Sequence, residues 1–328
     1  MVRELEFQKR IGYDGELVPV FERLSHLYGL GKYIEYVPIL QGYEDFNVIL
    51  TAEKGKYFVK MFATFRSDEE CRTYVGIIEQ ALEAGVSHPA LYNSPSGYMF
   101  EVPADSTKLR GCIMQYINGK SFYELGEAPG TDEMRFFAGQ AAIINNLDIE
   151  PRDIYDSWAI VNFLTEFEKN RQHLPPEDLR MINTVAEKFA NVQVQALPHC
   201  LVHGDIIKTN TMKDTEGKVY VLDFSVSNHY PRIQELAVLF CNLLFDENNP
   251  ETFDEYYKLG LEEYQKHIAF TSEELAALPV FVQAAHAMHV ICPIRERVVN
   301  GNDTTENEYW LNLGRVGLKY TTQVWNLE

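Results

Sequence analysis

Apolar and polar residues alternate along much of residues 33–62, and the turn Glu53-Lys54-Gly55-Lys56 separates two of the alternating runs. A period of two is typical of β-strands that bury one face. We therefore expect strands at residues 33–40, 47–51 and 57–62. Apolar runs at residues 98–102 and 109–117 extend the predicted sheet, and residues 85–91 belong to the same region.

Helical spacing occurs at residues 18–28 and again at residues 67–84, where Ser67 and Glu70 form a capping box. After residue 130 the pattern is mainly helical, with Thr131 as the expected cap of the first helix and Pro231 as the first residue of another. The expected helices of this part span residues 131–147, 155–171, 177–194, 231–245, a segment from 272 onward, and 304–324. The chain is thus predicted to be α+β.

One stretch, LVHGDIIKTNTMKDTEGKVYVLDF at residues 201–224, breaks the helical pattern and carries the candidate chemistry. Asp205 is followed five residues later by Asn210, and Asp223 ends a short apolar strand after a predicted hairpin turn. Each half alone is weak, because an aspartate at a strand end is more often a turn former. Together they suit phosphoryl transfer, in which one carboxylate accepts a hydroxyl proton while an amide oxygen and a second carboxylate hold Mg²⁺ on ATP.

His203-Gly204-Asp205, Asn210 and Asp223-Phe224 resemble the signature of the aminoglycoside phosphotransferase, choline kinase and homoserine kinase superfamily. The resemblance implies a two-lobed protein-kinase-like fold. Its N-lobe, residues 1–117, would be an antiparallel sheet with one helix that binds nucleotide. Its C-lobe, residues 118–328, would be mainly helical and would hold the catalytic and acceptor-binding groups.

The same resemblance implies roles for individual residues of the C-lobe. Asp205 would be the catalytic base, and His203 would support the loop around it. Asn210 and Asp223 would be the Mg²⁺ ligands. Glu235, in Glu235-Leu236-Ala237, would hold the catalytic loop through hydrogen bonds to its backbone.

Nucleotide contacts are expected from the first part of the chain. Lys60 shares a strand face with Phe58 and Phe62, which suits a lysine that reaches the ATP phosphates, although a surface lysine gives the same pattern. Glu70 is the candidate partner of that lysine, with Glu69 and Glu79 behind it, but the capping box explains Glu70 equally well. By resemblance, residues 42–47 would cover the nucleotide, and Met114, Gln115 and Ile117 would meet the adenine.

The charge of the chain bears on its partners. The formal net charge is -19, of which -4 falls on residues 1–117 and -15 on residues 118–328. Such a field repels nucleic acid and anionic membranes and attracts a cationic acceptor, although solubility explains most of these charges equally well. Glu306, Glu308 and Tyr309 are the candidate acceptor contacts. Five scattered cysteines, a charged N-terminus and the lack of a run of about 18 apolar residues favour a cytoplasmic protein without a membrane span.

We therefore predict an ATP- and Mg²⁺-dependent kinase that phosphorylates a hydroxyl of a small, amine-bearing molecule. Within the superfamily, choline, ethanolamine, homoserine and aminoglycosides are all acceptors of this kind. Two alternatives remain open. One is a serine/threonine protein kinase of the same fold, and the other is a nucleotide-binding regulator without catalysis.

Overall fold

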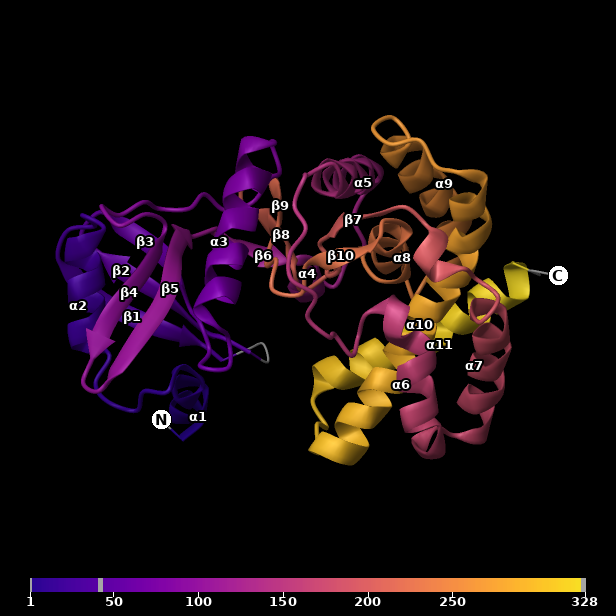
Figure 1. The fold of residues 1–328 in the computed structure, drawn as a ribbon, viewed down its shortest axis with the longest axis horizontal. Helices are drawn as coiled ribbons and strands as arrows, with labels where there is room; N and C mark the ends of the chain where they lie inside the picture. Colours follow the sequence, from indigo (N-terminus) through magenta and orange to yellow (C-terminus); the bar gives the residue numbers. More distant parts are fainter. Residues whose placement is uncertain (1, 41–43, 326–328) are drawn as a thin grey trace. The chain divides into compact units, whose positions relative to one another are not determined.

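The computed structural model describes residues 2–40 and 44–325. Over these residues the chain divides into two compact units, Met1–Asn118 and Gly119–Glu328. The first unit is built around a sheet and the second mainly from helices (Figure 1). The chain is therefore α+β with a sheet-rich N-terminal region and a helical C-terminal region, as the sequence predicted.

The described part of the first unit contains a five-stranded antiparallel sheet with the order β1-β2-β3-β5-β4 (Figure 1). Its strands are β1 (Tyr33–Ile39), β2 (Phe46–Ala52), β3 (Gly55–Met61), β4 (Met99–Ala104) and β5 (Thr107–Gln115). Buried and half-buried residues alternate without interruption along β2, as the period of two predicted. Residues 85–91 add no strand to the sheet and contribute one isolated bridge, between Leu91 and Met114.

The described part of the first unit also contains the helices α1 (Val2–Gln8), α2 (Val18–Leu27) and α3 (Asp68–Glu83). Phe21 and Leu24 of α2 are fully buried in a core that also contains Val59 and Met61 of β3. Because neighbours along a strand point to opposite faces, Lys60 faces away from that core. The helix α3 begins with the predicted capping box, in which Glu70 N donates to Ser67 Oγ at 3.2 Å and Ser67 N donates to Glu70 Oε2 at 2.6 Å.

The second unit contains, among its described residues, α4 (Phe122–Leu125), α5 (Thr131–Asn145), α6 (Phe163–Asn170), α7 (Pro176–Phe189), α8 (Ile233–Cys241), α9 (Phe253–Tyr264), α10 (Ser272–Asn300) and α11 (Thr305–Val324). Helix α10 packs against α7, α8 and α11. Two small sheets interrupt the helices. One has the order β6-β8-β9, from Gly119–Ser121, Thr211–Asp214 and Val219–Val221, and the other pairs β7 (His199–Val202) with β10 (Asn228–Pro231).

Three predicted helix starts in this unit are wrong, and the helices expected to end at residues 194 and 245 end at Phe189 and Cys241. The cap of α5 is Gly130, whose N–H donates to Glu133 at 2.8 Å, and Thr131 is already helical. Residues 155–159 are not helical, because Asp156 accepts from Trp158 N at 2.8 Å and holds a turn that delays α6. Pro231 is the last residue of β10, and α8 begins two residues later.

Helix α10 is long and apolar enough, by length and composition, to cross a membrane, which the expectation from the sequence overlooked. However, 78% of its most apolar window is buried inside the unit. Its apolar surface is therefore covered by neighbouring helices, as in the central helix of a folded core.

All five cysteines of the chain are free thiols. Cys71 and Cys112 are buried in the first unit, and Cys241 and Cys292 are buried in the second. Burial raises the pKa of the Cys71 thiol to about 11. Thiols in such surroundings are structural groups with little reactivity.

Candidate active site

A buried carboxylate of α8 accepts hydrogen bonds from the backbone of the turn that follows β7. His203 N and Gly204 N donate to the two oxygens of Glu235, at 2.5 and 3.3 Å, and Asn145 Nδ2 donates to the same carboxylate at 3.3 Å. Glu235 is fully buried, and burial raises its pKa to about 7, against the effect of these three donors. The backbone hydrogen bonds predicted for Glu235 are thus confirmed.

His203 is fully buried, and both nitrogens of its ring contact backbone atoms of the chain around the site. Nε2 lies 3.1 Å from Leu222 O, and Nδ1 lies 3.2 Å from Asp205 N. A carbonyl only accepts and an amide N–H only donates, so these contacts assign the proton to Nε2 of a neutral ring. The ring also packs on Phe224, with centroids 4.5 Å apart. His203 therefore links the segment before Asp205 to the segment before Asp223.

Asp205 and Asn210 are in direct contact. Asn210 Nδ2 donates to Asp205 Oδ2 at 2.5 Å and to Asp205 O at 3.3 Å, across a tight turn in which Asn210 N donates to Ile207 O. Leu222 N in turn donates to Asn210 O at 2.8 Å, which places the strand end that carries Asp223 beside this turn. The structure thus brings together the three polar residues that the sequence separated by a hairpin.

Asp223 has a left-handed backbone, with φ at 65°, which is uncommon for any residue other than glycine. Ser225 stabilises this conformation, because its N–H and hydroxyl both donate to Asp223 Oδ1, at 3.1 and 2.5 Å. Gly204, immediately before Asp205, also has a positive φ, of 79°. Each carboxylate is therefore presented from a sharp, locally fixed turn instead of a regular strand.

These oxygen atoms suit Mg²⁺. The nitrogen of the Asn210 amide is used by Asp205, which leaves the amide oxygen as the atom that would bind a cation. Amide and carboxylate oxygens are the ligands that Mg²⁺ prefers, with the remaining positions filled by water and phosphates. Residues 2–40 and 44–325 contain no cluster of three or more His, Cys, Asp or Glu that could hold a metal ion. A Mg²⁺ ion at this turn would therefore also need water and phosphate ligands.

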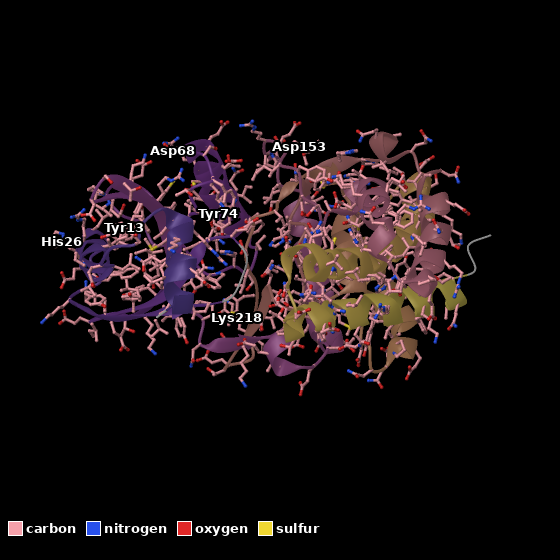
Figure 2. All side chains as sticks on the ribbon, turned by 90° about the horizontal axis from the view of Figure 1, so that it is seen from below. Tyr13, His26, Asp68, Tyr74, Asp153 and Lys218 are labelled. Atoms are coloured by element: carbon pink, nitrogen blue, oxygen red, sulfur yellow. The ribbon has the colours of Figure 1, made fainter. Side chains whose placement is uncertain are left out.

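In the first unit, Lys60 is buried on the sheet face opposite the core. Its Nζ lies 3.2 Å from Asp45 Oδ2 and 5.0 Å from the ring centroid of Tyr74, a residue of α3 labelled in Figure 2. Asp45 is 4% exposed and also accepts from Ala63 N, at 2.9 Å, and Arg66 Nε, at 3.1 Å. The lysine is therefore a buried cation in an ion-pair cluster, which excludes a solvated surface lysine.

The other nucleotide candidates have clear positions, and their roles stay predictions. Glu70 forms the capping box of α3, one of the two explanations that its sequence position allowed. Met114 and Ile117 are buried at the end of β5, and Gln115 N donates to Ala90 O at 2.8 Å. Part of the expected nucleotide-covering loop, Gly42 and Tyr43, lies outside the described residues.

The acceptor candidates are divided between two faces of α11. Glu306 and Tyr309 lie on one face with Trp310, since residues three and four apart share a helix face. Burial raises the pKa of Glu306, and a hydrogen bond with the Trp310 side chain partly lowers it. Glu308 is exposed on the other face and pairs with Arg297, so the structure does not bring it together with Glu306.

Aromatic rings surround this part of α11. The ring of Tyr123, from α4, lies 5.1 Å from that of Tyr309 and 5.7 Å from that of Trp310, and Tyr309 lies 4.9 Å from Trp310. Burial raises the pKa of Tyr123, and the charge of Glu306 adds a smaller contribution in the same direction. Tyr123, Tyr309 and Trp310 are called the aromatic cluster below.

Sequence reasoning missed Asp45, Lys208 and Tyr123. Asp45 stands one residue before β2, and an acidic residue directly beside an apolar strand is a feature of the sequence that could have marked it as a candidate. Lys208 lies inside the catalytic loop and is only 4% exposed. Tyr123 lies inside a further capping box, formed by Ser121 and Glu124, that was not recognised in the sequence. Nothing in the sequence pattern indicates which surfaces these side chains meet.

A profile of the phosphotransferase enzyme (APH) family matches residues 35–277. The chain is 21% identical over 266 residues to homoserine kinase of Zymomonas mobilis, which covers 78% of this chain and 79% of that protein. Two solved structures share the fold. An amicoumacin kinase in complex with AMP-PNP has a TM-score of 0.67 at 16% identity, covering 97% of this chain and 96% of that one. A microcompartment-associated aminopropanol kinase has a TM-score of 0.68 at 11% identity, covering 94% and 97%.

The family match spans most of the chain and includes the whole catalytic turn, from His203 to Asp223. It agrees with the geometry of Asp205, Asn210 and Asp223 described above. The protein therefore belongs to the APH phosphotransferase enzyme family and is a small-molecule kinase.

Proposed function

We propose that this kinase transfers the γ-phosphoryl group of ATP to a hydroxyl of a small molecule that also carries an amine. One observation carries the proposal. Asp205, Asn210 and Asp223 converge on a turn fixed by Glu235, although the second aspartate comes 18 residues after the first. The relatives named homoserine kinase and the structure named aminopropanol kinase support an acceptor with a hydroxyl and an amine.

Asp205 is the group that accepts the proton of the acceptor hydroxyl. Its carboxylate is oriented by the amide of Asn210, and its backbone by His203 and Glu235. A base fixed in this way needs little rearrangement before the attack, and positioning supplies much of the rate in phosphoryl transfer. His203 remains buried and neutral and acts on the loop, not on the substrate.

Asn210 and Asp223 would hold Mg²⁺, and Lys60 would neutralise phosphate charge from the first unit. When bound, the ion screens the negative charge of the phosphates. Asp45 then has a clear purpose in this scheme, since it keeps the Lys60 ammonium in a defined place.

The amine of the acceptor is expected at Glu306 and the aromatic cluster. A partly buried carboxylate beside aromatic faces is a favourable environment for an ammonium group. The net charge of -15 on residues 118–328 favours the approach of a cation to this unit.

The protein-kinase alternative receives no support from the segment after Asp223. Only residues 224–227 lie between Asp223 and β10 in the structure. A segment of that length leaves little room for an activation loop, the element that protein kinases use to organise a protein substrate.

The test combines an acceptor panel with a base variant. ATP consumption is measured with homoserine, ethanolamine, 1-amino-2-propanol, choline, an aminoglycoside and a generic protein. Asp205→Asn should lower transfer to the best acceptor by a factor on the order of 100 or more while ATP binding survives. Asp132→Asn removes an exposed carboxylate of α5 and serves as the matched control. Unchanged transfer in Asp205→Asn, or phosphorylation of the protein alone, would overturn the proposal.

A further inference from the structure

Lys208 is a buried cation inside the catalytic loop, three residues after Asp205. Its Nζ lies 3.1 Å from Phe245 O, 3.1 Å from Glu247 Oε2 and 2.8 Å from Tyr309 Oη. A lysine ammonium has three N–H donors, and each of them has an acceptor here. The side chain therefore serves the protein and is not aimed at a phosphate.

The main chain of Lys208 is bonded as well. Its N–H donates to Asn242 Oδ1 at 3.0 Å, and its carbonyl accepts from Tyr123 N at 3.0 Å. Asn242 continues the connection, because its Nδ2 lies 3.0 Å from His289 Nε2 on α10. Lys208 thus contacts the end of α8, the start of α4 and, through Asn242, the centre of α10.

Both sets of bonds end on the aromatic cluster. The side chain of Lys208 bonds the hydroxyl of Tyr309, and its carbonyl bonds the backbone of Tyr123. His289 packs edge-on against Trp310, with centroids 5.9 Å apart. Lys208 is therefore bonded directly to Tyr309 and to the backbone of Tyr123, and it is linked to Trp310 through Asn242 and His289.

We infer that Lys208 is a positioning residue that sets the distance between Asp205 and the aromatic cluster with Glu306. This distance selects acceptors by the number of bonds between their hydroxyl and their ammonium group. The inference rests on the proposed function, in which the hydroxyl meets Asp205 and the ammonium group meets the cluster. Lys208 itself touches neither end of the acceptor.

The charge of the ammonium also matters for this role. Glu247 is the acid that pairs with Lys208, and its Oε2 also lies 3.4 Å from the Tyr309 hydroxyl. Because Glu247 is already occupied by a cation of the protein, it is not available to the acceptor, whereas Glu306 lies beside the cluster without an ion pair to a lysine or arginine among the described residues. Lys208 thereby neutralises Glu247 and leaves Glu306 as the acid proposed to bind the ammonium group of the acceptor.

The experiment uses linear amino alcohols of increasing length, namely ethanolamine, 3-amino-1-propanol and 4-amino-1-butanol. The wild-type enzyme should prefer one length. Lys208→Met should lower kcat/KM for that acceptor by a factor on the order of 10 to 100 and flatten the preference, since small misplacements are costly. The KM for ATP should stay within about twofold, because the change removes no nucleotide contact.

One further variant keeps the test decisive if Lys208→Met folds poorly. Tyr309→Phe keeps the ring and removes only one acceptor of the ammonium, so it should change the preference in the same direction. The double variant should be no worse than Lys208→Met alone, since residues of one network do not add. Lys213→Met, which removes a partly exposed lysine of β8 that pairs with Glu133, is the matched control and should keep the preference.

The possible failures are distinguishable. If Lys208→Met and Tyr309→Phe keep the length preference and lose only melting temperature, Lys208 has a purely structural role and the inference is wrong while the proposed function stands. If the wild-type enzyme phosphorylates no amino alcohol or other amine-bearing acceptor, the proposed function fails first, and this inference fails with it.

Discussion

At the scale of single residues, Asp45 is the acid at the centre of a buried ion-pair cluster in the first unit. Its carboxylate is shared by Lys60 and Arg66, and all three residues are buried. When one member of a buried ion pair is removed, the remaining charge has no partner and little water. The cluster should therefore matter both for stability and for the position of Lys60.

Asp45→Asn tests this role. We expect a loss of about 3–5 kcal/mol in the unfolding free energy of the first unit, together with a raised KM for ATP. Denaturant unfolding and steady-state kinetics measure the two effects. Asp68→Asn is the control, because Asp68, labelled in Figure 2, pairs with Arg110 and Lys108 at a partly exposed site. Equal effects of the two substitutions would show that burial of Asp45 has no special consequence.

His286 sets a second prediction, for the pH dependence of stability. It is fully buried in α10 with neither ring nitrogen hydrogen-bonded among the described residues, and burial, with a smaller contribution from His289, lowers its pKa from 6.5 to about 3. The unfolded chain therefore binds a proton at pH values where the folded chain does not. Stability from neutral His286 is present above pH 6.5 and is lost as the pH falls toward 3.

His286→Leu should remove this contribution. Between neutral pH and about pH 5, the melting temperature of the wild type should fall by about 4 °C more than that of the variant. Calorimetry at the two pH values gives the comparison, and His267→Leu, at an exposed site of the same unit, is the control. A parallel fall in wild type and His286→Leu would contradict the buried neutral state.

At the scale of elements, α10 and α11 pack with their backbones close together. A Cβ on Gly314 of α11 would lie 2.7 Å from the carbonyl carbon of His289 and 2.8 Å from the carbonyl oxygen of His286. These are backbone atoms that cannot rotate away. A Cβ on Gly76 of α3 would meet no atom within 4 Å.

The two glycines should therefore respond to alanine with opposite signs. Gly314→Ala should destabilise the second unit by about 1–3 kcal/mol through overpacking, even though alanine favours helix. Gly76→Ala should stabilise the first unit by about 0.4–1 kcal/mol. Chemical denaturation of each variant measures both. A stabilised Gly314→Ala would mean that the two helices can move apart at little cost.

The elements also show what the sequence was able to predict. The strands β2 and β3 and the capping boxes at Ser67 and Thr271 depend on local patterns, and they were predicted within one or two residues. The start of α6 was not, because it depends on the side chain of Asp156 in an apparently helical run. Pro231 fits a helix start by sequence, but its pairing with His199 makes it a strand end.

The same distinction applies to the site. Asp205, Asn210 and Asp223 could be proposed from their order and spacing together with the family resemblance, since the chemistry proposed for them requires a fixed order along the chain. Asp45 and Lys208 were not found, because their importance comes from partners distant in sequence, such as Tyr309, 101 residues after Lys208. Glu308 looked equivalent to Glu306 in the sequence and differs only in the helix face it occupies.

At the scale of the whole molecule, the uneven charge predicts how the enzyme responds to salt. Residues 118–328 carry most of the net negative charge, so a cationic acceptor should be attracted to this part of the chain. Salt screens this attraction, and at physiological ionic strength the Debye length is only about 8 Å. The kcat/KM for the acceptor should fall as salt rises, while kcat stays nearly constant. Steady-state kinetics with a cationic acceptor and a neutral alcohol of similar size, at several salt concentrations, gives the result. A flat profile for the cationic acceptor would leave the acidic surface as a solubility feature.

The placement of the thiols gives each unit its own internal reporter. Cys71 and Cys112 are buried in one unit, and Cys241 and Cys292 in the other, so a thiol reagent reaches each pair only when that unit opens. Mass spectrometry of pulse-labelled peptides would therefore read the opening rates of both units from one unmodified sample. Nucleotide that binds mainly to the first unit should slow labelling of Cys71 and Cys112, and an acceptor that binds to the second should slow labelling of Cys241 and Cys292.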